Sequence, residues 1–176
     1  MRGMMMFAAA LAAAAACGQV ETAPVEVQAL KSYVWVKESA AKSDPLLKEV
    51  AAFFEKNDHF YLATVDGEGA RVRPIRYTLI VDNKLVFATT PKKEMYKQLL
   101  KNPGVELSRH ATDGASFVRF KGKAVLCEDA EVRAKFVELQ PDMVKKLGDG
   151  LTLFCVEPEM VGIFSMKGEK PKTKSF

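Results

Sequence analysis

The first regular pattern in the chain is helical and lies in residues 43–57. Its apolar residues recur at helical spacing, so one face of the helix is apolar: Leu46, Leu47, Val50, Ala51 and Phe54. Asp44 precedes this stripe and can cap the helix, and Pro45 takes the first helical position, where its missing N–H is harmless. We therefore expect the folded domain, residues 43–176, to begin with a helix that packs on a core.

Short β-rich runs separated by turn signals follow this helix. The predicted strands are residues 59–65, 70–81, 84–90, 105–111, 115–127, 151–158 and 159–166, the last two as a hairpin. Helices are predicted at residues 91–101 and 128–150, the second broken near Pro141. The connections are short and hairpin-like, so the pattern predicts a mainly β fold with inserted helices. Six or seven antiparallel strands of this kind favour a barrel over a βαβ fold.

The first 17 residues have the layout of a secretory signal. Arg2 precedes an alanine-rich apolar stretch that ends in Ala14–Cys17, which resembles a bacterial lipobox with Cys17 as the lipidated residue. Gln19 favours the outer membrane of a Gram-negative cell, so we expect export to the envelope, with the N-terminal anchor as the only membrane contact. Plain cleavage, which gives a periplasmic protein, and a start codon assigned upstream of a cytoplasmic protein are the alternatives.

Residues 18–42 show no sustained period and are interpreted as a linker, with a short strand at residues 32–36. The whole chain of 176 residues suits one folded domain. Its formal net charge of +4 comes without zinc-finger spacing, a glycine-rich phosphate loop or a basic helical stripe. We therefore expect no nucleic-acid partner.

Two adjacent lysines stand where the 91–101 helix is predicted to begin. With Thr90 as the cap and Pro91 as the first helical residue, Lys92 and Lys93 fall in the first turn, which is the positive end of the helix dipole. The two lysines repel each other and the positive helix end there. A phosphate bound between the lysines and the free N–H groups would remove this repulsion. Exposure to water is the simpler interpretation of this segment alone, because the repulsion costs only about 0.3–1 kcal/mol per lysine.

The order of several segments points to a family. The informative segments are YLATVDG (61–67), RVRP (71–74), TTPKKEMYKQLLKNPGVE (89–106) and VRFKGKA (118–124). In this order they resemble the FMN-binding split-barrel family named after pyridoxamine 5′-phosphate oxidase, and most closely its small single-domain bacterial members. The resemblance covers residues 44–176 and implies an antiparallel split β-barrel. It also implies a homodimer that holds FMN at the subunit interface.

The resemblance also assigns residues to the cofactor. Lys92 and Lys93 would hold the FMN phosphate, with Thr89 and Thr90 alongside. The strand beside the flavin ring and one further position near the ring would contribute Arg73, Pro74, Ile75 and Phe117. Phe117 stands where relatives often have Trp or Gln, which keeps stacking possible but removes a hydrogen-bonding group.

Two functions are compatible with these features. The first is an FMN-dependent oxidoreductase that acts on a small organic molecule, such as a quinone or a nitro compound. The second is a non-catalytic module of the envelope that binds flavin or a haem-like tetrapyrrole. No catalytic side chain is proposed, because a flavin brings its own redox chemistry. His59 and His110 lack the paired spacing of a metal site.

Two further expectations concern the ends of the domain. The chain ends at KPKTKSF without the segment rich in Arg, Trp and Pro that grips the substrate in true vitamin B6 oxidases, which argues against that activity. Cys127 and Cys155 lie on late strands, and we expect both to be small buried residues that are not bonded to each other.

Overall fold

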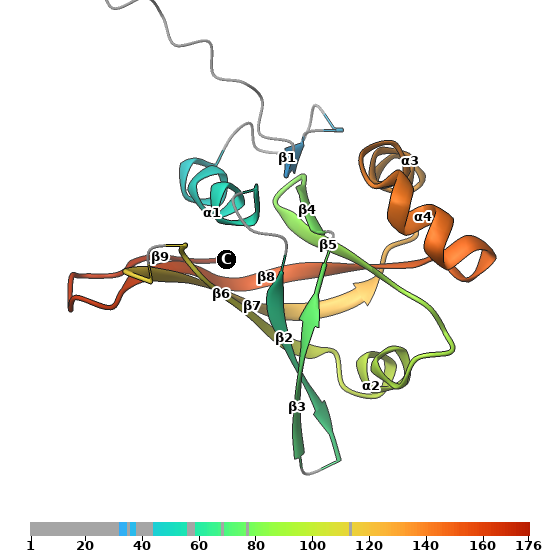
Figure 1. Ribbon diagram of the computed structural model, residues 1–176, viewed down its shortest axis with the longest axis horizontal. Coiled ribbons are helices and arrows are strands. Elements are labelled where there is room, and N and C mark those ends of the chain that lie inside the picture. The colour runs from blue at the N-terminus through green and yellow to red at the C-terminus, as the bar shows by residue number, and fades with distance from the viewer. Residues whose placement is uncertain are drawn as a thin grey trace, which may run out of the picture.

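The computed structural model describes residues 32–34, 36–37, 44–55, 59–67, 69–76, 78–112 and 114–176 (Figure 1). The signal-like segment, the proposed anchor Cys17 and most of the linker therefore lie outside the described residues. Among the described residues, no helix has the length and apolar character needed to cross a bilayer.

A mixed sheet of nine strands forms the centre of the described structure. Its strands are β1 (Tyr33–Val34), β2 (Phe60–Asp66), β3 (Gly69–Ile75), β4 (Thr78–Val81), β5 (Lys84–Thr89), β6 (Gly104–His110), β7 (Ser116–Leu126), β8 (Thr152–Ser165) and β9 (Lys172–Ser175). The order is β1-β4-β5-β8-β7-β6-β2-β3, with β9 paired to β8. β1 runs parallel to β4, and every other pair is antiparallel. β1 and β3 lie at the two ends of this order and do not pair with each other, so the sheet formed by the described strands is not closed.

The mainly β fold predicted from the sequence is confirmed, and the strand order is consistent with a split barrel. The expected number of six or seven strands is too low. The predicted run 70–81 is divided into β3 and β4, and β9 is an additional strand that hydrophobic alternation does not reveal. The short strand predicted in residues 32–36 is β1.

The hairpin predicted for residues 151–166 is wrong, because these residues form the single long strand β8. Its register with β7 shifts at one point, where Lys121 pairs with Met160 but Gly122 pairs with Pro158. The extra residue between them makes a bulge, and a bulge is one of the few places where a sheet accepts proline. Gly122 is needed there, since a Cβ atom would lie 2.0 Å from the Glu157 carbonyl oxygen.

In the described part of the chain, four helices and a short 3₁₀ turn pack around the sheet: α1 (Pro45–Glu55), α2 (Glu94–Lys101), α3 (Ala130–Leu139), α4 (Pro141–Leu147) and η1 (Gly148–Gly150). α1 and α2 bury apolar residues in the larger core. α3 and α4 lie side by side in Figure 1 and cover a second core around Phe136. The predicted break of the 128–150 helix near Pro141 is confirmed.

A disulfide joins Cys127 and Cys155, whose Cα atoms lie 5.2 Å apart. The expectation that these cysteines are unbonded is therefore wrong. The Cys127 N–H donates to the Leu153 carbonyl at 2.9 Å, which continues the β7–β8 pairing and brings the two side chains together. That pairing was not available from the sequence. The bond closes a loop that contains α3, α4 and η1.

A buried carboxylate joins the start of α1 to the C-terminal strand. Asp44 caps α1, as predicted, by accepting hydrogen bonds from the N–H groups of Leu46 and Leu47 at 3.0 and 3.2 Å. Its other oxygen forms an ion pair with Lys174 of β9, and its side chain is only 6% exposed. Burial favours the neutral acid, but Lys174 and the two N–H groups outweigh it, so the pKa of Asp44 lies below its ordinary value of 3.8.

We predict that two substitutions at Asp44 separate its roles. Asp44→Asn keeps a capping oxygen and loses the ion pair, whereas Asp44→Ala loses both and should lower the free energy of unfolding by about 1 kcal/mol more. A lowered native pKa stabilises the fold above the unfolded pKa and is lost as the pH falls through the native value. Wild type should therefore lose stability below about pH 4 more steeply than Asp44→Asn in urea titrations. Equal acid slopes would contradict the ion-pair assignment.

Candidate functional site

A short turn separates the end of β5 from the start of α2. The Thr90 carbonyl accepts a hydrogen bond from the Lys93 N–H at 3.0 Å, and the helix begins only at Glu94. Thr90 is therefore not the helix cap and Pro91 is not the first helical residue, because the Thr90 carbonyl closes this turn instead. Lys92 lies within the turn, and Lys93 occupies the cap position without a capping side chain.

The turn is a positive, exposed feature at the N-terminal end of α2. Both lysines are exposed, and among the described residues neither forms an ion pair. The Tyr96 N–H donates to the Lys93 carbonyl at 3.0 Å, and no side chain among the described residues caps the N-terminus of α2, so N–H groups of its first turn remain for a ligand. Glu94 supplies one negative charge nearby, but its carboxylate is bonded to Lys97 at 2.8 Å. Lysine charges and helix N–H groups together fit an anion such as a phosphate.

Two threonines border the turn on the protein side. Thr89 is fully buried, and its Oγ1 atom has no hydrogen-bond partner among the described residues. A buried hydroxyl of this kind costs free energy unless a further group meets it. Thr90 lies against η1, where a Cβ atom on Gly150 would come within 2.9 Å of its Oγ1. In Figure 1 the connection from β5 to α2 runs between α4 and α2.

Arg73 approaches the same helix from β3. Its Nη1 donates to Thr64 Oγ1 at 2.9 Å, and its Nη2 donates to Gln98 Oε1 at 2.8 Å. Thr64 Oγ1 also donates to Gln98 Oε1 at 3.0 Å, so the three side chains form a closed network. Both acceptors are neutral, and among the described residues Arg73 meets no carboxylate. α2 thereby connects Arg73 with the lysine turn.

Sequence reasoning missed Thr64 and Gln98, although each interrupts an apolar pattern. Gln98 is buried between Met95 and Leu99 on the inner face of α2. Thr64 takes the third inward position of β2 after Phe60 and Leu62. A polar residue in a buried stripe requires a partner, and this requirement is the signal that could have identified both.

The model of the family described as "Pyridoxamine 5′-phosphate oxidase" matches residues 46–162. The chain belongs to this family. The match covers the strands and helices that form the lysine turn and the Arg73 network. No curated protein matches the chain.

Solved structures of the same fold carry several descriptions. A NimC/NimA family protein from Clostridium acetobutylicum is 29% identical, with a TM-score of 0.64, covering 73% of this chain and 91% of that one. A haem-binding protein from Mycobacterium smegmatis is 16% identical, with a TM-score of 0.62; the match covers 77% of this chain and 60% of that one. An FMN-binding protein from Nostoc punctiforme, described as related to pyridoxamine 5′-phosphate oxidase, is 14% identical, with a TM-score of 0.55, covering 77% and 99%.

The remaining residues assigned by resemblance to the oxidase family lie apart from the turn. Ile75 is buried in the main core opposite Phe60, so its side chain packs there. Pro74 is exposed on the other face of the sheet, opposite Tyr61. Arg73 is therefore the one side chain of these three that reaches α2.

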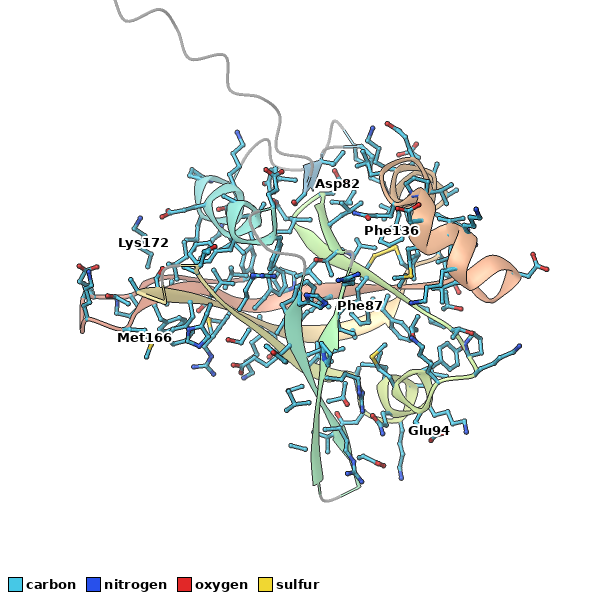
Figure 2. The ribbon with its side chains drawn as sticks, in the orientation of Figure 1. Asp82, Phe87, Glu94, Phe136, Met166 and Lys172 are labelled. Atoms are coloured by element: carbon cyan, nitrogen blue, oxygen red, sulfur yellow. A yellow bond between two sulfur atoms is a disulfide. The ribbon has the colours of Figure 1, made fainter. Side chains whose placement is uncertain are left out.

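Phe117 lies at the far end of the molecule from the lysine turn. It pairs with Phe164 of β8, whereas Thr89 pairs with Thr152 of the same strand. These β8 positions are twelve residues apart, or about 40 Å in an extended strand. Figure 2 shows Met166, just beyond β8, on the opposite side of the molecule from Glu94 at the start of α2. Within one chain, the structure does not bring Phe117 to the other predicted site residues.

Proposed function

We propose that this protein is an FMN-dependent oxidoreductase that acts on a small organic molecule. The observation that carries the proposal is the turn before α2. There Lys92 and Lys93, which form no ion pair among the described residues, lie at a helix N-terminus without a capping side chain, next to Thr89 in the sequence. These donors suit a phosphate monoester, which needs charge and several hydrogen bonds. Membership of the oxidase family, and the Nostoc punctiforme relative described as FMN-binding, support FMN as the phosphate compound.

The residues of this chain would bind and orient the cofactor. Lys92 and Lys93 would neutralise the phosphate, with the α2 N–H groups and the Thr89 hydroxyl as further donors. Bound FMN would supply the transfer of electrons between donor and substrate. The protein then needs a site that holds the ring close to the substrate and excludes misaligned approaches.

A homodimer would complete this site. Phe117 shares a sheet face with Tyr61, Val72 and Pro74, as the registers of β2, β3, β6 and β7 show. Tyr61 and Val72 are 57% and 65% exposed. Exposed apolar side chains on one face suit a second copy of the chain. Phe117 of the same chain lies far from the lysine turn. In a two-fold dimer, Phe117 of the second subunit could instead lie beside the ring.

We predict that the lysine turn recognises the phosphate of FMN. Lys92→Ala combined with Lys93→Ala should weaken FMN binding by about 1.5–3 kcal/mol for each charged hydrogen bond lost, and should leave riboflavin binding nearly unchanged. Titration of protein fluorescence or flavin fluorescence measures both affinities. Lys48→Ala with Lys84→Ala removes the same charge from α1 and from the other end of β5, and should change neither affinity. Equal weakening of FMN and riboflavin would refute the phosphate assignment.

The oxidoreductase activity itself has a direct test. The protein reconstituted with FMN should be reduced by NADH, NADPH or a reduced quinone, and reoxidised by a quinone, a nitroaromatic compound or oxygen over many turnovers. Loss and recovery of absorbance at the flavin maximum record both half-reactions. If FMN binds but no pair of donor and acceptor reduces and reoxidises it repeatedly, the oxidoreductase proposal is excluded and the non-catalytic carrier is left. Preferential, tight haem binding would favour the haem carrier, the property named for the Mycobacterium smegmatis relative.

We propose export to the cell envelope, anchored through Cys17. The signal-like residues 1–17 motivate this location, and the disulfide between Cys127 and Cys155 supports it, because such bonds persist mainly in oxidising compartments. Cys17→Ala should abolish incorporation of labelled fatty acid and move the protein from the membrane fraction to the soluble fraction. A wild-type chain that stays in the cytoplasm and retains Met1 would exclude this location.

A further inference from the structure

Arg73 has an unusual set of partners for a half-buried cation. Its two hydrogen bonds go to the neutral oxygens of Thr64 and Gln98, which are 2% and 8% exposed. Arg71, two residues earlier on the same strand, is instead paired with Asp66. The network therefore fixes the position of the Arg73 guanidinium but leaves its charge uncompensated by the described residues.

Fixing a cation in this way is costly unless an anion meets it. Removing charge from water is unfavourable, and a neutral acceptor returns less free energy than a carboxylate does. Only two of the five N–H donors of a guanidinium are used by Thr64 and Gln98. The remaining donors and the charge are available to a ligand.

Helix α2 sets the distance between this charge and the lysine turn. Gln98 follows Lys93 by five residues, or about 7.5 Å along the helix axis. Arg73 thus lies along the helix beyond the phosphate position, so one elongated ligand could meet the lysines at one end and Arg73 at the other. A ligand with a second negative charge away from its phosphate matches both features.

We propose that Thr64 and Gln98 are positioning residues that hold Arg73 beside the flavin ring, where its charge favours the reduced cofactor. This inference rests on the proposed function. A neutral flavin ring that takes up two electrons and one proton gains one negative charge. A fixed cation beside the ring stabilises that charge without reorganising, and charges near the ring nitrogens tune the electronics of a flavin.

The test is the midpoint potential of bound FMN, measured against a reference dye during reduction with dithionite. Arg73→Gln should lower the ratio of reduced to oxidised cofactor at least tenfold, which is about 30 mV for a two-electron couple. Arg73→Lys keeps the positive charge but loses the planar guanidinium, so its midpoint potential should lie between those of wild type and Arg73→Gln. The dissociation constants of oxidised and reduced FMN give the same ratio independently.

The positioning role is tested by neutral substitutions, which add no charge of their own. Thr64→Val and Gln98→Met should lower the potential in the wild-type background, and should have no further effect when Arg73 is already Gln. Thr64→Ser keeps the hydroxyl and should have the wild-type midpoint potential. Thr78→Val, at a buried threonine of β4 outside the network, is the matched control and should change nothing.

Two results would overturn the inference alone. FMN that binds with normal affinity but an unchanged potential in Arg73→Gln would show that Arg73 does not act on the ring. Equal effects of Thr64→Val with and without Arg73 would show that Thr64 does not act through it. Wild-type protein that fails to bind FMN would instead refute the proposed function, and this inference with it.

Discussion

The pairing of β8 with its neighbours is the constraint on which the rest of the structure depends. Its 14 residues pair with β5 at one end, with β7 along most of their length and with β9 at the other end. The bulge opposite Gly122 lets the strand continue through Pro158 instead of ending there. Because β8 is continuous, one end of the sheet supports the lysine turn and the other supports Phe117. A strand broken at Pro158 would not fix the distance between the lysine turn and Phe117.

Helix α2 joins two elements that the sheet alone keeps apart. The lysine turn follows β5, on one side of β8, whereas Arg73 belongs to β3, at the far end of the strand order. Gln98 links them, because α2 starts at the turn and its buried face reaches Thr64 and Arg73. The candidate site therefore depends on one polar residue within an apolar helix face. Its burial ties the position of Arg73 to the position of the whole helix.

Local signals in the sequence predicted the elements well, and long-range pairing limited the rest. Asp44 and Pro45 mark the start of α1 correctly, because capping depends on adjacent residues. Thr90 and Pro91 form an equally plausible local signal, yet the turn closed by the Thr90 carbonyl delays α2 by three residues. The local sequence favours Pro158 as a strand end, whereas the bulge that accommodates it depends on the partner strand. Local sequence does not reveal which residue of β7 lies opposite.

The candidate site shows the same division between local and long-range information. Thr89, Thr90, Lys92 and Lys93 lie within five consecutive residues, so their grouping follows from the sequence. The contacts of Arg73 with Thr64 and Gln98 join β3, β2 and α2, and no local pattern indicates them. The separation of Phe117 from the turn is visible only in the registers of β5, β7 and β8. The disulfide was missed for the same reason.

The loop closed by Cys127 and Cys155 has a consequence for the integrity of the chain. Lys145 and Lys146 lie exposed on α4, inside this loop, and are cleavage points for trypsin-like proteases. A cut there would leave two polypeptides that remain one covalent molecule, with the ends of β7 and β8 still joined. The nicked protein would migrate as a single band without reductant and as two bands with it. A cut in α4 would thus not release the C-terminal fragment, which includes β8.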